Sequence, residues 1–143
     1  MMRHDPYESL GFHGALTGRA FLGALEKKLK GTGVSPVQFV ALGQLIALGP
    51  MTQTQVTGIL SVTPATGVRL VDRMERDGWV IRQAYPGDGR AKRLVPTEKA
   101  TKIWGKVSHF GRELLNEAYQ GIHPSEIETV KRVLDQVRRN LGA

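Results

Sequence analysis

The sequence predicts a mainly α-helical chain with one small β-hairpin. Apolar residues recur every three or four positions over most of the 143 residues, which is the period of amphipathic helices. Between residues 79 and 95 the period shortens to two, as in a pair of strands. Helix-start signals, in which a serine or threonine precedes proline, glutamine or glutamate, stand at Ser35, Thr52, Thr63 and Thr97.

The composition limits the classes of function. A net charge of +7 suits a polyanionic partner, either nucleic acid or an anionic membrane surface. The absence of cysteine excludes disulfides, thiolate metal sites and thiol redox switches, and it fits a reducing compartment. No apolar run approaches the roughly 20 residues of a membrane span, and residues 1–6 lack the apolar core of a signal peptide. We therefore expect a cytoplasmic protein with no membrane partner.

The first predicted helix covers residues 7–30. Phe21, Leu25 and Leu29 belong to an apolar stripe at spacings of four. Four glycines in this segment each weaken a helix by about 1 kcal/mol relative to alanine, or else allow another helix to approach closely. The sequence Gly-Thr-Gly at 31–33 ends the helix.

Two shorter helices follow. Ser35 with Gln38 forms a capping box, in which each side chain accepts a hydrogen bond from the other residue's backbone, and this helix ends at 49–50. Thr52 with Gln55 repeats the pattern and opens the next helix. That helix is expected to turn Val56, Ile59 and Leu60 inward.

The rest of the chain is organised around residues 63–78. Thr63 suits an N-cap, Pro64 suits the first helical position, and Gly78 suits a left-handed C-cap. A helix, a tight turn and a second helix rich in arginine make a helix-turn-helix, so we interpret this segment as a DNA recognition helix. The spacing predicts an apolar face of Val68, Val71 and Met74 and a polar face of Thr66, Arg69, Arg73 and Arg76.

Residues 79–95 form the predicted hairpin, with the turn-forming residues at 85–90 between its strands. The loop and the return strand carry Arg90, Lys92 and Arg93. A basic hairpin beside a helix-turn-helix is a wing, so the fold class becomes a winged helix-turn-helix.

The remaining chain predicts two helices with heptad-like apolar stripes. One runs from Thr97 to about Gly121, and the other starts at Pro124. Such helices need partners, so the terminal helices of two chains are expected to pack as a symmetric dimer. The predicted division is residues 1–34 as an N-terminal dimerisation region, 35–97 as the DNA-binding lobe and 98–143 as C-terminal dimerisation helices, without a flexible linker.

This order of parts resembles the MarR family of transcriptional regulators, closest to its SlyA-like branch. The sequence RLVDRMERDGWVIR at 69–82 looks like the family's R-L-V-D-R-L-E-x-x-G-L-V-x-R, and DGRAKR at 88–93 and TEKA at 97–100 match further motifs. Gly67, Gly89 and Pro96 depart from the family pattern. Gly67 either loosens the recognition helix or lets it sit closer to DNA.

The resemblance implies that Arg69 contacts bases in the major groove, because guanidinium pairs bidentately with guanine. The alternative is that Arg69 pairs with Asp72 or Asp77 along its own helix. Arg73 is either a phosphate clamp or a member of an ion pair beside Glu75, and the sequence leaves both open.

The resemblance also implies that Arg90 enters the minor groove and that Asp88 orients it, while Lys92 and Arg93 contact phosphates. The complete predicted DNA-contact set is Thr63, Pro64, Ala65, Thr66, Arg69, Arg73, Asp88, Arg90, Lys92 and Arg93.

An effector cleft is implied next to His13, Thr17, Arg19 and Trp104, for which ordinary packing or surface exposure is the alternative. The four histidines stand alone, and the sequence has no phosphate-cradling loop and no nucleophile elbow. We therefore expect no metal site, no cofactor and no enzyme activity.

The expected function is sequence-specific regulation of transcription. The protein would bind a pseudo-palindromic site in double-stranded DNA as a homodimeric repressor, released by a small aromatic or anionic effector. The alternative is a winged helix that serves as a protein-interaction module, because fold alone does not fix function. Such a module would present an apolar helix face, and the arginines at 69, 73 and 76 argue against it.

Overall fold

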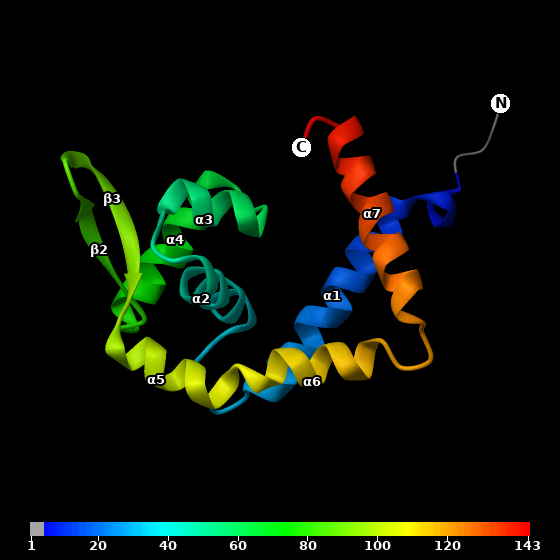
Figure 1. Ribbon diagram of the computed structural model, residues 1–143, viewed down its shortest axis with the longest axis horizontal. Coiled ribbons are helices and arrows are strands. Elements are labelled where there is room, and N and C mark those ends of the chain that lie inside the picture. Colours follow the sequence, from blue (N-terminus) through cyan, green and yellow to red (C-terminus); the bar gives the residue numbers. More distant parts are fainter. Residues whose placement is uncertain (1–4) are drawn as a thin grey trace. The chain divides into compact units, whose positions relative to one another are not determined.

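The computed structural model describes residues 5–143, apart from the side chains of residues 88–91. Its helices and one small antiparallel sheet confirm the predicted fold class (Figure 1). The elements in chain order are η1 (Pro6–Glu8), α1 (Leu10–Leu29), α2 (Pro36–Leu48), β1 (Met51–Thr52), α3 (Gln53–Leu60), α4 (Pro64–Arg76), β2 (Val80–Tyr85), β3 (Asp88–Pro96), α5 (Glu98–Val107), α6 (His109–Ala118) and α7 (Pro124–Asn140).

The chain divides into two compact units, Met1–Phe110 and Gly111–Ala143. The first unit holds α1 to α5 and the sheet, and the second holds most of α6 and all of α7. The three-part functional division at residues 34 and 97 stays a prediction.

The N-terminal helix begins later than predicted. Ser9 Oγ accepts a hydrogen bond from Phe12 N (3.3 Å), and this cap starts α1 at Leu10 rather than at Tyr7. The preceding residues Pro6–Glu8 form a separate 3₁₀ turn. The glycines do not break the helix, and an added Cβ would meet nothing within 4 Å at Gly14, Gly18 or Gly23.

The starts of α2 and α3 are confirmed. Both capping boxes are complete, Ser35 with Gln38 and Thr52 with Gln55. The predicted burial of Ile59 is wrong, since its side chain is 45% exposed while Val56 is 2% exposed. The face of α3 that holds Val56 turns inward, and Ile59 lies off that face.

The caps of α4 are also confirmed, but its buried face is shifted. Thr63 is the N-cap, and Gly78 follows the helix with φ +81°. The buried residues are Gly67, Val71 and Met74, whereas Val68 is 43% exposed, so its predicted burial is wrong. The reason is that α3 approaches α4 closely at Gly67. This contact places the backbone of Gly67, rather than the side chain of Val68, on the buried face of α4.

The hairpin belongs to a three-stranded antiparallel sheet in the order β1-β3-β2. The sequence did not predict β1, because a strand of two residues has no detectable period. Met51 of β1 pairs with Leu94 of β3, and Arg82 of β2 pairs with Leu94 from the other side. The central strand β3 thereby connects the wing to the start of α3.

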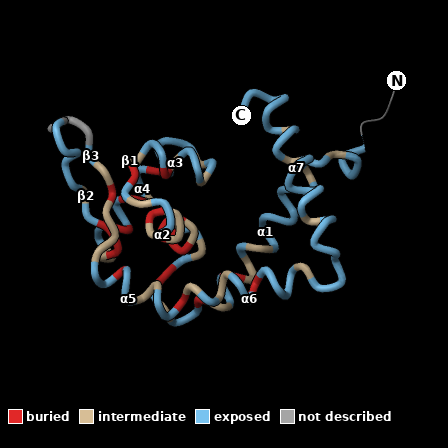
Figure 2. The backbone as a smooth tube through the Cα atoms, viewed as in Figure 1, coloured by how far each residue is buried: buried red, intermediate tan, exposed pale blue. Residues whose placement is uncertain are grey.

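The core of the first unit lies where α2, α4 and α5 meet the base of the sheet (Figure 2). The side chains there are apolar and almost inaccessible, which makes their burial the main stabilising contribution. They include Leu42, Leu45, Val71, Met74, Val80, Leu94 and Val107.

The single helix predicted after Thr97 is instead divided at Ser108 into α5 and α6. Ser108 keeps right-handed helical dihedrals (φ −57°, ψ −33°), and its N–H donates to Trp104 O at 2.9 Å. The interruption is therefore local, and nothing in the sequence pattern marks it.

The last helix starts at Pro124 as predicted. His123 is its N-cap, with Nδ1 accepting from Ser125 N at 3.1 Å, and Glu126 completes the capping box. No residue of α7 is buried within the described chain, and Val130 of its apolar stripe is 54% exposed.

Candidate nucleic-acid interface

The N-terminal end of α4 is exposed and preorganised. Thr63 Oγ1 accepts a hydrogen bond from Thr66 N (3.2 Å) and donates to Thr66 Oγ1 (3.0 Å). Pro64 and Ala65 beside them are exposed. The first amides of a helix carry partial positive charge, so this end suits phosphate oxygens or base edges.

Arg69 and Arg73 lie on the exposed face of α4, and no carboxylate among the described residues pairs with either. Within the described part of the chain, Arg69 makes a polar contact from Nη2 to Thr66 Oγ1, at 3.5 Å. The alternative partners predicted for Arg69 are engaged elsewhere, Asp72 with Arg82 and Asp77 with Gln38. Both guanidinium groups are therefore open to an external anion.

Arg82 of β2 joins the wing to the recognition helix. Its Nη2 donates to Asp72 Oδ1 at 2.8 Å, its Nη1 donates to Glu75 Oε1 at 2.9 Å, and Nη2 also reaches Gln53 Oε1 at 3.2 Å. The Arg82 side chain is 24% exposed. One guanidinium thus holds two acidic residues of α4 and the first residue of α3, which fixes the base of the wing against both helices.

The C-terminal end of α4 is held by neighbouring elements. Gln38 of α2 is 2% exposed, and its Nε2 donates to Asp77 Oδ2 at 3.0 Å. Lys99 Nζ of α5 donates to Asp77 O at 2.6 Å, and Thr97 Oγ1 donates to Gly78 O at 2.6 Å. The recognition helix is therefore anchored at its C-terminal end and exposed at its N-terminal end.

The basic side chains of the wing differ in how strongly other residues hold them. Lys92 is exposed, whereas Arg93 donates from Nη2 to Gln83 Oε1 (3.2 Å) and lies over the Tyr85 ring at 5.7 Å. Arg93 Nε is buried without an acceptor among the described residues. The predicted contacts of Asp88 and Arg90 fall on side chains outside the described residues.

Residues 32–91, which run from the start of this lobe into β3, match the model of the MarR family. This segment is therefore similar to the winged helix-turn-helix of MarR-family proteins. Proteins of the MarR family are transcriptional regulators and not enzymes, which agrees with the lack of a catalytic motif in the sequence. The assignment to a SlyA-like branch stays a prediction.

Solved structures share the fold over most of the chain. MarR from E. coli in its apo form is 23% identical, with 90% of this chain and 96% of that chain covered and a TM-score of 0.72. A MarR mutant from E. coli complexed with operator DNA is 23% identical (90% and 92% covered, TM-score 0.79). CouR from Rhodococcus jostii, bound to p-coumaroyl-CoA, is 23% identical (94% and 95% covered, TM-score 0.81).

Among the residues that the structure describes, no polar or ring contact joins the four side chains predicted to bind an effector. The ring centroid of Trp104 lies 4.8 Å from that of Phe39. This contact agrees with the alternative that Trp104 is an ordinary packing residue. His13 Nε2 lies 2.8 Å from Tyr7 O, and Thr17 and Arg19 are exposed on α1. A role for this set in binding an effector stays a prediction.

No group of three or more histidine, aspartate or glutamate side chains is arranged to hold a metal ion within residues 5–143, side chains of 88–91 aside. Within the same residues, no helix combines the length and apolar character needed to cross a membrane.

Three residues of this lobe have structural roles that the sequence did not predict. Arg82 and Gln38 hold α4 through side chains far away in sequence, and Gly67 marks the contact with α3. A signal for Arg82 does exist, because Asp72 and Glu75 stand three residues apart on one helical face and require a cation. Gln38 gave no such signal beyond its capping box.

Proposed function

We propose that this protein is a sequence-specific regulator of transcription that binds double-stranded DNA as a homodimeric repressor. One observation carries the proposal. The acidic residues Asp72, Glu75 and Asp77 are all engaged by other side chains, which leaves Arg69 and Arg73 open on the exposed face of the same helix. The DNA complex of a MarR mutant from E. coli, which has the same fold, supports this choice of partner.

In the proposed complex, the N-terminal half of α4 enters the major groove. Arg69 pairs with a guanine edge, and Thr63, Pro64, Ala65, Thr66 and Arg73 contact nearby base edges or phosphates. The wing lies beside it, with Arg90 in the minor groove, Asp88 orienting Arg90, and Lys92 and Arg93 on phosphates.

Dimerisation is proposed because α1 and α7 leave large apolar residues uncovered. Leu10, Leu16 and Leu22 of α1 are 42–52% exposed, and Leu141 at the end of α7 is 79% exposed. A symmetric pair would place two recognition helices about 34 Å apart, one turn of DNA, and so match a pseudo-palindromic operator.

Release by a small effector is part of the proposal. CouR, which shares the fold, is bound to p-coumaroyl-CoA, an aromatic and anionic ligand. Such a ligand acts through its different affinities for two spacings of the recognition helices.

Selection from a random duplex pool tests this function. Specific regulation requires enrichment of an inverted repeat and an affinity that falls steeply with salt, since phosphate neutralisation releases counterions. The alternative protein-interaction module would enrich no repeat.

A further inference from the structure

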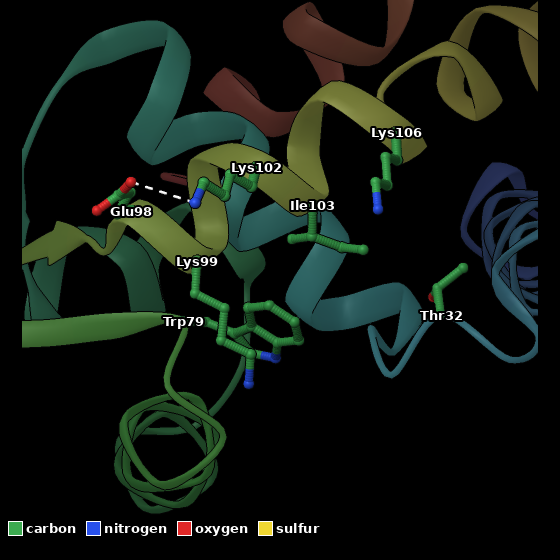
Figure 3. Close-up of a pocket in the computed structure, with 7 residues that line it drawn as sticks. All are labelled: Thr32, Trp79, Glu98, Lys99, Lys102, Ile103 and Lys106. Carbon is green, nitrogen blue, oxygen red and sulfur yellow. Dashed lines mark ion pairs between the residues drawn. The ribbon is translucent and has the colours of Figure 1, made fainter.

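A basic hollow lies on α5, away from the helix face that packs in the core. Lys99, Lys102, Ile103 and Lys106 line it at helical spacings of three and four, and Trp79 forms its other wall (Figure 3). The cavity measures about 490 Å³, which is within the usual size of small-molecule sites. All of these residues belong to the first compact unit.

Two of the three lysines of the hollow, Lys102 and Lys106, are held only weakly by other groups of the protein. Lys102 Nζ pairs with Glu98 Oε1 at 3.3 Å, but both side chains are at least 75% exposed, so this pair exchanges readily with a competing anion. Lys106 has no recorded partner among the described residues. The lining holds three lysines and one glutamate, which leaves an excess of two positive charges.

The aromatic wall supplies the second, independent observation. Trp79 is 5% exposed, and its indole Nε1 is buried without a hydrogen-bond acceptor among the described residues. Lys99 Nζ lies over the same ring, 4.4 Å from its centroid (Figure 3). The Trp79 side chain thus gives the hollow an apolar wall with an ammonium group beside it.

We propose that this hollow binds a small organic phosphate that carries a flat ring. The phosphate pairs with Lys102 and Lys106, because lysine ammonium groups act as point charges toward phosphate oxygens. The ring lies against Trp79 and Ile103, which form the apolar part of the lining.

The hollow is connected to α4 through Lys99. The same ammonium group that covers Trp79 donates to Asp77 O, at the C-cap of α4. An anion that draws Lys99 from Asp77 O would loosen this end of the recognition helix. This coupling rests on the proposed function, whereas the binding site does not.

Phenyl phosphate is a suitable probe, with phenol and inorganic phosphate as partial ligands. The chain has two tryptophans, so the Trp104→Phe variant reports Trp79 emission alone. We expect a saturable change with phenyl phosphate and at least tenfold weaker binding of either partial ligand. If Trp104→Phe does not fold, isothermal titration calorimetry on the wild-type protein gives the dissociation constants of the same three ligands.

The double variant Lys102→Ala/Lys106→Ala should weaken phenyl phosphate binding at least tenfold. Lys131→Ala on α7 removes another exposed lysine, one outside the hollow, and should leave binding unchanged. Absence of saturation, or equal binding by the double variant and the wild type, would overturn the site.

DNA is the competing source of phosphate, and a duplex titration separates the two sources. If the double variant loses duplex affinity without ligand and the wild type does not bind phenyl phosphate, the lysines hold DNA and the proposal is wrong. The phenyl phosphate titration contains no DNA, so it tests the binding site independently of the proposed function. If the protein binds phenyl phosphate saturably but selects no duplex, the site stands and only the regulatory function is wrong.

Discussion

Gly67 of α4 lies directly against Thr57 of α3. A Cβ at residue 67 would stand 2.9 Å from Thr57 Cγ2 and 3.0 Å from Thr57 Cβ, closer than carbon atoms approach without displacement. Thr57 cannot rotate away without loss, because its hydroxyl donates to Gln53 O at 2.8 Å. The absent side chain therefore sets the approach of the two helices, and the alternatives of a looser helix or closer DNA contact are not needed to explain the glycine.

Gly67→Ala should destabilise the fold despite the higher helix propensity of alanine. Overpacking typically costs about 1–3 kcal/mol, against a propensity gain of about 1 kcal/mol. Urea unfolding followed by circular dichroism measures the net loss. The control is Gly58→Ala, where an added Cβ meets nothing within 4 Å and stability should rise or stay level.

A companion variant makes the prediction specific to the contact. If Thr57 is the obstacle, Thr57→Ala should recover part of the stability lost in Gly67→Ala. Equal losses with threonine and with alanine at residue 57 would show that the contact is not the cause.

Gln38→Glu should produce a pH-dependent loss of stability. The variant carboxyl would face the Asp77 carboxylate at a site that is 2% exposed, so burial and like charge both raise the pKa of the variant carboxyl in the folded state. A group whose folded pKa is raised stabilises below its unfolded pKa, and that contribution is lost as the pH rises through the folded pKa. The variant should therefore be closest to wild-type stability in acid and weakest near neutral pH.

Urea titrations of Gln38→Glu between pH 4 and 8, each compared with the wild type at the same pH, check this. Gln38→Met fills similar space and removes both hydrogen bonds without adding a charge, so its deficit should change little with pH. A parallel pH dependence in the two variants would refute the carboxyl pairing.

Arg82→Ala should weaken DNA binding although Arg82 is not in the proposed contact set. Its loss frees the base of the wing from Asp72 and Glu75 and leaves two adjacent carboxylates unpaired near the DNA face. We expect a loss on the order of 1 kcal/mol in stability, the size of exposed or partly exposed ion pairs, and a larger loss in duplex affinity. Fluorescence anisotropy with the selected duplex measures the latter.

Arg82→Lys is the matched variant. It keeps the charge but lacks the planar fork that reaches both carboxylates, so it should fall between the wild type and Arg82→Ala. Wild-type affinity in Arg82→Ala would show that the wing does not depend on this residue.

Val130→Asp should weaken the proposed dimer. Val130 belongs to the α7 stripe and is 54% exposed in the chain by itself, so the change costs little in a monomer but buries a charge in a dimer. Sedimentation velocity should show a monomer where the wild type sediments as a dimer. Leu48→Asp alters a 69%-exposed leucine of α2 and should leave the dimer intact.

Local signals predicted local structure well. The caps at Ser35, Thr52 and Thr63 are set by neighbours three residues away, and all three are confirmed. The wrong predictions concern side chains whose burial depends on contacts between different helices. Val68 and Ile59 were assigned to the core by period alone, but the crossing of α3 and α4 at Gly67 decides which face turns inward.

The candidate site divides in the same way. The exposed arginine face follows from helical spacing, so its residues could be named from the sequence. The network around Arg82 and the support from Gln38 depend on side chains 29 and 39 residues apart, which no single segment reveals. The basic hollow beside Trp79 likewise arises only when α5 meets the segment that follows α4.

The measurement that tests the central claim most directly compares Arg69→Ala with Arg76→Ala on the selected duplex and on a scrambled duplex of equal length. Arg76 shares the helix and the charge, but it lies at the C-terminal end near Asp77. Arg69→Ala should lose roughly ten- to hundredfold in affinity for the selected duplex and little for the scrambled one, since a bidentate base contact provides about 1–3 kcal/mol of discrimination. Arg76→Ala should lower both affinities slightly and equally. Equal affinity of the wild type for the two duplexes, or unchanged discrimination in Arg69→Ala, would contradict the assignment of α4 as a helix that reads DNA sequence.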